Sequence, residues 1–287
     1  MSDIVIRQDR VWTERNIIKW GGFIFLALFS VMILTPFVWL FVTSLKDMGQ
    51  YFSTDFKTIW FPHPLHWENY YKAFTYVPLL RYVFNSLWLG SLQTSLQLVS
   101  SSFVAYGFAR FNFRGRNILF LILLCTMLLP TEVTMIPLFI FYKTIGWTNS
   151  YNPLIVPNLF GAAWSIFLIR QLMVGIPKEM DEAAFMDGAG TFRIWYSIVV
   201  PQVTPALFVA GLNSFLWSWK DFLGPLIYLN KKELYTLPLG IMFFESPTEV
   251  QYTVQLAAVV VALIPTLIIF AIGQKYFEQG INIGELK

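Results

Sequence analysis

Residues 176–205 read IPKEMDEAAFMDGAGTFRIWYSIVVPQVTP, a charged stretch in a chain that is otherwise mostly apolar. Pro177 suits the first position of a helix, and Gly188 and Gly190 tolerate the left-handed turn that ends one. The pattern predicts a helix over about residues 177–188, which would extend about 15 Å, half the thickness of a bilayer core. Because this helix is also rich in charged side chains, we expect it to lie outside the membrane.

One face of this helix is suited to contact with another surface. Met180, Ala183 and Ala184 share that face because they are spaced at i, i+3 and i+4. The paired alanines form a small, smooth flank that allows close approach, and Glu182 beside them offers an anchoring charge. The pattern therefore predicts a docking element, with a plain connector at the membrane surface as the alternative.

The composition indicates a membrane protein. Of the 287 residues, 56% are hydrophobic and 13% are charged, against about 25% charged in an average soluble domain. The net charge of +3 is too small to indicate a nucleic-acid partner. Cys125 is the only cysteine, and the two histidines, His63 and His66, lie in a predicted loop without a cysteine or carboxylate cluster. No disulfide framework and no metal site are therefore expected.

Long uncharged runs predict an all-α, polytopic fold with one membrane domain over residues 1–287. A bilayer core needs about 20 apolar residues in a helix, and six runs meet that length with few interruptions. They lie at about residues 20–43, 83–107, 117–141, 151–170, 203–228 and 255–275. Residues 46–81 form a long loop between the first two spans.

The lysines and arginines of the connections predict the orientation. Twelve lie in connections on the side of the N-terminus and seven on the opposite side. Because cytoplasmic loops are enriched in these residues, both termini are expected in the cytoplasm. The helix at 177–188 then lies in the cytoplasm as well, and the loop at 46–81 lies outside.

The sequence Glu182-Ala183-Ala184, followed by Gly188, Ile198 and Pro201, resembles the EAA loop of importer permeases driven by ATP-binding cassettes (ABC importers). The longer run IPKEMDEAAFMDGAG is similar to the carbohydrate branch of that family, which includes the maltose-transporter permeases. Further segments resemble the family along nearly the whole chain: Asn69-Tyr70, Asn85-Ser86-Leu87, Phe103 to Arg116, Pro130 to Pro137, Phe167 to Arg170 and the tail QKYFEQGINIGELK.

This resemblance implies a type I ABC importer permease fold in a bacterial-type inner membrane, where lipid surrounds it. It implies a second homologous permease, two cytoplasmic ATPase subunits and an extracytoplasmic solute-binding protein as partners. The chain has no Walker A sequence, so ATP and Mg²⁺ are expected on the ATPases, and the permease needs no cofactor and performs no catalysis. The residues that the resemblance assigns to ATPase coupling are Glu182, Ala183, Ala184, Asp187, Gly188 and Pro201.

Charged residues at membrane depth suggest a substrate pathway. Glu132 and Lys220 are expected about 24 and 26 Å from the cytoplasmic ends of their spans, and such groups are usually paired or face a cavity. We hypothesise that they border the outer end of the pathway together with Asp221, with pairing among the three as one arrangement. The alternative is that Lys220 and Asp221 simply end the fifth span and extend toward water.

Trp217, close to Lys220, could stack on a sugar ring, although tryptophans near helix ends commonly belong to interfacial belts. In the family that the chain resembles, asparagine commonly occupies the position of Lys220. The sequence therefore predicts a carbohydrate importer permease without indicating which sugar. A non-sugar solute is the first alternative. An ion-coupled secondary transporter is a weaker one, because only Glu132 and Asp221 could serve as intramembrane carboxylates.

Overall fold

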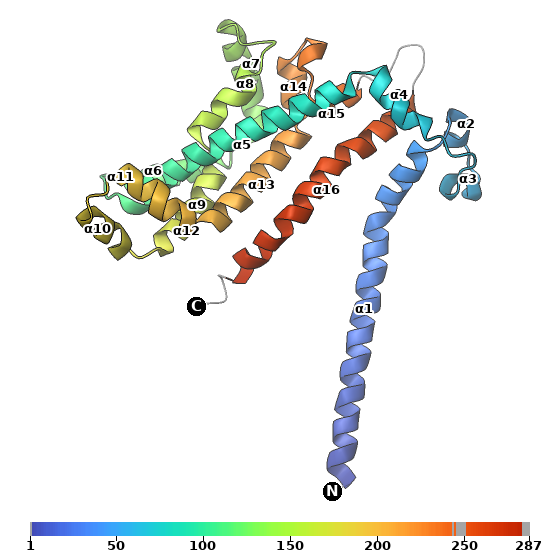
Figure 1. Ribbon diagram of the computed structural model, residues 1–287, viewed down its shortest axis with the longest axis horizontal. Coiled ribbons are helices and arrows are strands. Elements are labelled where there is room, and N and C mark those ends of the chain that lie inside the picture. Colours follow the sequence, from blue (N-terminus) through green and yellow to red (C-terminus); the bar gives the residue numbers. More distant parts are fainter. Residues whose placement is uncertain (1, 243, 245–250, 283–287) are drawn as a thin grey trace. The chain divides into compact units, whose positions relative to one another are not determined.

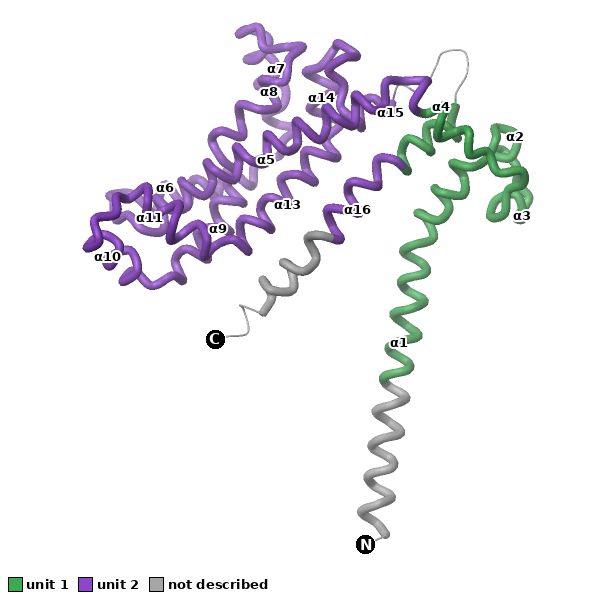
Figure 2. The backbone as a smooth tube through the Cα atoms, viewed as in Figure 1, with its two compact units in different colours: residues 1–73, 247–260 green, residues 74–246, 261–287 purple. Residues whose placement is uncertain are grey.

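The computed structural model describes residues 2–242, 244 and 251–282, with side chains placed for residues 19–242, 244 and 251–271. All regular structure in these ranges is helical, which confirms the predicted all-α class (Figure 1). The chain divides into two compact units (Figure 2). Unit 1 contains residues 1–73 and 247–260, and unit 2 contains residues 74–246 and 261–287.

Unit 1 is organised around the long helix α1 (Ser2–Ser44). The segment Lys19–Ser44 is long and apolar enough to cross a membrane, and none of its most apolar window is buried inside the structure. Large side chains such as Trp20 and Met32 are exposed along it. This part of α1 therefore offers its apolar surface to lipid or to another subunit.

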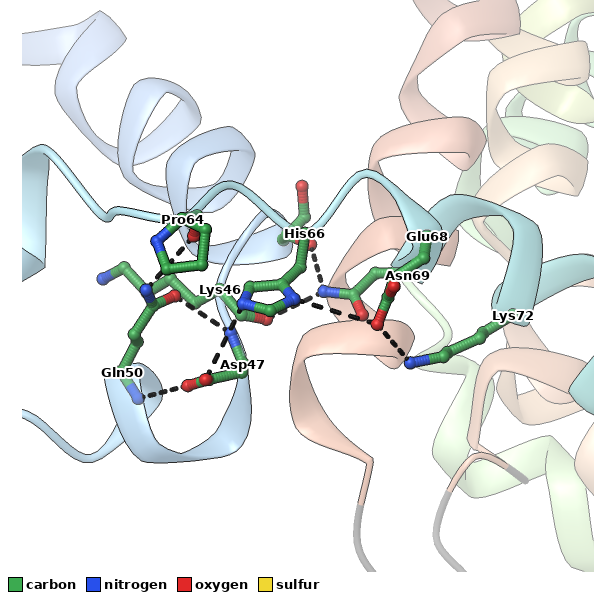
Figure 3. A network of polar contacts seen from close by, with 9 residues as sticks. Lys46, Asp47, Gln50, Pro64, His66, Glu68, Asn69 and Lys72 are labelled. Carbon is green, nitrogen blue, oxygen red and sulfur yellow. Dashed lines mark hydrogen bonds and ion pairs between the residues drawn. The ribbon is translucent and has the colours of Figure 1, made fainter.

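The loop after α1 folds back on the end of that helix. It contains α2 (Met48–Tyr51), α3 (Phe56–Trp60) and the start of α4 (Glu68–Tyr76). The buried amide of Asn69 donates hydrogen bonds to the backbone oxygens of Ser44 and Lys46, at 2.9 and 2.8 Å. Figure 3 shows these contacts among their polar neighbours. They fix the start of α4 against the end of α1.

A row of ionisable side chains continues this network (Figure 3). His66 lies 3.7 Å from a carboxylate oxygen of Asp47 and 3.8 Å from one of Glu68. Lys72 pairs with Glu68 at 2.6 Å, and this contact lowers the pKa of the Glu68 carboxyl below its ordinary value. Burial lowers the pKa of the Lys46 ammonium. The predicted loop at 46–81 is thus an ordered element with its own short helices.

Unit 2 is built on α5 (Leu79–Arg110), which packs mainly against α9 (Ala163–Gly175) and α13 (Thr204–Lys220). Small residues let these helices approach closely. The Cβ of a side chain added at Gly211 of α13 would lie 3.0 Å from Leu98 of α5. The core between the three helices includes Ala105, Ile166, Ile169, Met173, Val203, Ala206 and Ala210.

One of the predicted spans is strongly bent, and another begins at a sharp bend. Where one helix was expected at 117–141, α6 (Arg116–Thr126) and α7 (Thr131–Thr144) meet at 94°. Before α13, a continuous run formed by α11 (Thr191–Ile194), the π-helical η2 (Trp195–Val199) and α12 (Val200–Gln202) ends in a bend of 81°. Pro130 precedes α7 and Pro205 opens α13, so each bend has a proline that limits helix continuation.

The remaining elements are short, apart from the last. They are α8 (Asn152–Ile155), η1 (Val156–Phe160), α10 (Glu179–Met186), α14 (Leu223–Tyr228), η3 (Lys232–Leu234), α15 (Leu237–Met242) and α16 (Tyr252–Asn282). The predicted span at 203–228 is divided between α13 and α14, and the one at 151–170 begins with α8 and η1 before α9. The last five residues of the tail QKYFEQGINIGELK lie outside the described residues.

By length and hydropathy, three segments of the described chain could each cross a membrane, or up to five if each bent pair counts as one span. The three are Lys19–Ser44, Asn152–Gly175 and Tyr252–Ala271. Helix α5 has 32 residues and is long enough, but its glutamines and serines make it too polar to join them. The count of six spans and the cytoplasmic placement of the termini stay predictions.

Candidate coupling and translocation sites

The charged stretch that was predicted to be a helix forms α10, which lies with α11 and α6 at the end of α5 that carries Arg110 (Figure 1). Its last turn is closed by Gly188, whose φ is +81°. The backbone N–H of Gly188 donates to the oxygen of Phe185, and that of Ala189 donates to the oxygen of Ala184. Asp187 occupies the C-cap position. A left-handed glycine turn therefore ends the helix and directs the chain into α11.

The two faces of α10 differ. Asp181 and Ala184 are buried, and Ala184 belongs to the core of unit 2 together with Ile194. Glu182 and Ala183 are exposed. The expected flank of paired alanines is thus divided, because Ala184 packs into the core of unit 2 and leaves only Ala183 on the outer surface.

The exposed face of α10 also carries large apolar side chains. Met186 is 88% exposed and Phe185 is 51% exposed. Exposed apolar groups of this size beside a charged residue are typical of a protein contact surface. The exposure of Phe185 and Met186 depends on which face of α10 packs against the rest of unit 2. The spacing of residues in the sequence did not indicate that face.

Asp181 is held by the last turn of α5. The Nε of Arg110 lies 2.8 Å from Oδ2 of Asp181, and the two side chains are 5% and 11% exposed. The Nη1 of Arg110 donates to the backbone oxygen of Ile176 at 2.9 Å. Burial raises the pKa of the Asp181 carboxyl, and the Arg110 guanidinium opposes that rise. The sequence analysis missed this ion pair, which joins residues 71 positions apart.

Pro201 lies in the short helix α12 and is exposed. The path from α10 to α13 passes through Gly190, the π-helical segment Trp195–Val199 and the bend of 81°. Segments of π-helix often mark functional sites. Helix α10 is therefore connected to α13 by a series of short elements.

A cavity of about 600 Å³ opens between α5, α9 and α13; we call it the polar cavity. Its lining includes two tryptophans, Trp164 and Trp217. Amide, hydroxyl and carboxylate side chains supply most of its hydrogen-bonding groups. These polar lining residues are Gln93, Gln97, Thr131, Tyr142, Asn158, Ser165, Asn213, Ser214, Ser218, Asp221 and Tyr228.

Gln97 joins the three helices inside this cavity. Its Nε2 donates to Oγ of Ser165 on α9 at 2.9 Å, and its Oε1 accepts from Oγ of Ser214 on α13 at 3.1 Å. One turn earlier, Gln93 donates to the backbone oxygen of Leu154 at 2.7 Å. The signal that could have revealed the cavity is this pair of glutamines, spaced at i and i+4 in a predicted span.

The predicted pathway residues separate into two groups. Trp217 and Asp221 line the polar cavity, and Asp221 accepts a hydrogen bond from the N–H of Gly224 at 3.1 Å. Lys220 is exposed, with its Nζ 4.9 Å from the centre of the Trp217 ring. Glu132 is exposed in the first turn of α7. Neither Lys220 nor Glu132 lines the cavity.

The pairing considered for these charges is not formed. Within the described part of the chain, no ion pair joins Glu132 to Lys220, or Lys220 to Asp221. The physical reason is that each of the three charged groups lies in a different environment. The carboxylate of Asp221 caps the turn into α14, the ammonium of Lys220 lies over an indole ring, and Glu132 faces outward.

Comparison with known proteins supports the resemblance found in the sequence. The chain is 34% identical over 265 residues to the arabinooligosaccharides transport system permease protein AraQ of Bacillus subtilis, covering 92% of this chain and 94% of the relative. It is 30% identical over 266 residues to the sulfoquinovosyl glycerol transport system permease protein SmoH of Agrobacterium fabrum, covering 92% and 93%.

A crystal structure of a bacterial ABC transporter involved in the import of the acidic polysaccharide alginate contains a chain with the same fold. The TM-score is 0.80 at 21% identity, covering 91% of this chain and 97% of that one. Residues 97–283 match the model of the family described as binding-protein-dependent transport system inner membrane component. The chain is therefore a multi-pass inner-membrane protein that belongs to the family of binding-protein-dependent transport system inner membrane components, with an ABC importer permease fold.

Proposed function

We propose that the chain is a permease subunit of an ATP-driven importer and that the polar cavity forms its part of the pathway for a carbohydrate. The observation that carries this proposal is the lining of the cavity. Amides and hydroxyls such as Gln97 and Ser214 can donate to and accept from sugar hydroxyls, while Trp217 offers a flat apolar face. Relatives named for oligosaccharide and glycoside transport support the same substrate class.

The character of the lining favours an uncharged, hydroxyl-rich solute. Among the described residues that line the cavity, Asp221 is the only charged one. A phosphate, or the carboxylate of an amino acid, needs a cationic partner in a buried site, and a polyamine needs several anionic partners, whereas this lining offers one carboxylate and no cation. We therefore infer a neutral carbohydrate in preference to these other solutes.

The proposed complex contains a second homologous permease, two ATPase subunits and an extracytoplasmic solute-binding protein. ATP and Mg²⁺ bind to the ATPases, and this chain acts without a cofactor or a catalytic step of its own. The exposed face of α10, with Glu182, Ala183 and Met186, supports its assignment as the ATPase contact. Asp187, Gly188 and Pro201 shape the turn and the helix that follow it.

The coupling mechanism is a shift between two conformations of the pathway. ATPase subunits can drive that shift only if their open and closed forms bind α10 with different free energies. The segment after α10 leads through α12 into α13, whose residues Ser214 and Trp217 line the polar cavity. Movement of α10 can thereby alter the cavity.

The direct test is uptake into vesicles that contain the purified complex. The chain is co-expressed with candidate permease and ATPase partners and reconstituted with ATP on the ATPase side and binding protein on the other. Uptake of a labelled neutral oligosaccharide is expected to require ATP and binding protein together. Uptake driven by an ion gradient without ATP would reject the importer assignment, and competition by charged solutes alone would reject the carbohydrate.

Lys220 and Trp217 provide a graded test of the pathway. We expect Lys220→Ala to reduce uptake about two- to fivefold, because a partly exposed cation–π contact contributes about 0.5–1 kcal/mol. Trp217→Ala should reduce uptake further, since Trp217 itself lines the cavity. Lys143→Ala, at the exposed end of α7, is the matched control. Equal uptake by wild type and Lys220→Ala would show that Lys220 only ends α13.

A further inference from the structure

The ion pair between Arg110 and Asp181 joins two elements with different roles in the proposed importer. Arg110 lies in the last turn of α5, and Asp181 lies on the inner face of α10. The Nε lies 2.8 Å from Oδ2 of Asp181, within ion-pair distance, and Nη2 donates a hydrogen bond to Oδ1 at 3.5 Å. The third nitrogen, Nη1, binds the oxygen of Ile176 just before α10. One guanidinium therefore holds both the helix and its entry.

Stability alone gives little reason for such a pair. Buried ion pairs commonly stabilise a fold no better than well-packed apolar residues of similar volume, because both charges lose their hydration. A planar guanidinium that donates directional hydrogen bonds from two of its nitrogens does fix the relative position of its partners. The arrangement therefore fits a role in which the position of α10 relative to α5 matters.

Helix α5 leads directly from this contact to the polar cavity. Gln97 and Gln93 precede Arg110 by 13 and 17 residues, which corresponds to about 20 and 26 Å along an uninterrupted helix. The segment Leu79–Arg110 contains no break. The path from α10 to α13, in contrast, passes through a glycine, a π-helical segment and the bend of 81°. Of these two paths, the one through Arg110 has fewer places that can absorb movement.

We propose that Arg110 and Asp181 are positioning residues that transmit movement of the coupling helix α10 into α5, and so to Gln93 and Gln97 in the polar cavity. This inference rests on the proposed function, because it assigns a route for the ATPase-driven movement. It adds a second path to the covalent connection through α12 and α13. The ion pair links the surface of α10 to the polar cavity, and neither residue is proposed to contact ATP or the solute.

The test measures solute taken up per ATP hydrolysed in the reconstituted complex. Arg110→Gln and Asp181→Asn are expected to lower this ratio about fivefold or more. Co-purification of the ATPase should persist, because Glu182 and Ala183 remain exposed. Arg110→Lys, which keeps the charge but not the planar guanidinium that contacts both Asp181 and Ile176, should fall between wild type and Arg110→Gln. Arg114→Gln, on the exposed loop after α5, is the matched control.

The double exchange Arg110→Asp with Asp181→Arg provides a rescue. It should recover part of the lost ratio, because the ion pair is restored while the donor to the Ile176 oxygen is not. A wild-type ratio in both Arg110→Gln and Asp181→Asn would overturn the proposal. Loss of the ATPase from both variants would also overturn it, since the pair would then only shape the docking surface.

A labelling experiment separates this inference from the proposed function. In a Cys125→Ser background, which removes the only native cysteine, Ser95→Cys on the exposed side of α5 is treated with a maleimide. The labelling rate is expected to change on ATP addition in the otherwise wild-type complex and to stay constant with Arg110→Gln. Failure of sugar uptake by wild type would reject the proposed function, whereas an ATP response that survives Arg110→Gln would reject the link.

Discussion

Replacing Gly188 with valine is expected to reduce ATP-dependent uptake about tenfold or more and to lower the amount of ATPase that co-purifies. Gly188 has a φ of +81°, a conformation that costs an L-residue roughly 1–2 kcal/mol and a β-branched one more. No atom lies within 4 Å of the position where a Cβ would be added. The penalty therefore comes from the backbone, and it falls on the turn that ends α10 and fixes its outer face.

Three further variants separate the turn from the surface it supports. Gly188→Asn should be tolerated better than Gly188→Val, because asparagine adopts the left-handed conformation more readily. Gly175→Ala is the control, since it also has open space but no positive φ. Glu182→Lys leaves the turn intact and reverses a charge on the exposed face, and it should also release the ATPase. If Gly188→Val and Gly188→Asn transport equally well, the left-handed turn is not required for coupling.

The local features of α10 could be predicted from the sequence. Pro177, the charged residues and Gly188 act within a few positions of one another, so the helix and the left-handed turn that ends it follow from neighbouring residues alone. The structure has α10 from Glu179 to Met186 and a left-handed glycine two positions later. The family resemblance that rests on the same residues is confirmed by the match over residues 97–283.

The inner face of that helix could not be predicted in the same way. Whether Ala183 or Ala184 faces the permease depends on how α10 is seated on Ile194 and its neighbours, and helical spacing places both alanines near one stripe. The partner of Asp181 is Arg110, which only the packing of α5 against α9 brings close. Contacts between residues far apart in the sequence carry no periodic signal.

The substrate pathway was predicted from charge, whereas nearly all the described side chains that line the polar cavity are neutral. Glu132 and Lys220 drew attention because charges are costly in a membrane, yet neither lines the polar cavity. Glutamines and serines are less costly there, so they stand out less in an apolar run. The bend of 94° between α6 and α7 was also missed, because prolines in membrane helices are compatible with straight and bent spans alike.

Gln97 is the residue of the polar cavity whose replacement should affect uptake most. Gln97→Leu keeps a similar volume but removes the acceptor of Ser214 and the donor to Ser165. Leaving such groups unsatisfied costs about 1–3 kcal/mol in a buried site, and the cavity also loses an amide that could bind sugar hydroxyls. We expect uptake to fall about tenfold or more, measured as initial rates over a range of oligosaccharide concentrations.

The comparison with Ser95→Ala shows whether the reduced uptake of Gln97→Leu arises from the change in the cavity lining. Ser95 lies on the same helix and bonds only to the backbone oxygen of Ser91 one turn earlier, so its replacement should leave uptake unchanged. The ATPase should co-purify normally with Gln97→Leu, because Gln97 lies about 20 Å from the α10 end of α5. If Gln97→Leu lost the ATPase, its defect would be one of folding. If Gln97→Leu transported at the wild-type rate at every concentration, the solute would not pass through the polar cavity. Any pathway through that cavity should be slowed by loss of the side chain that joins α5, α9 and α13.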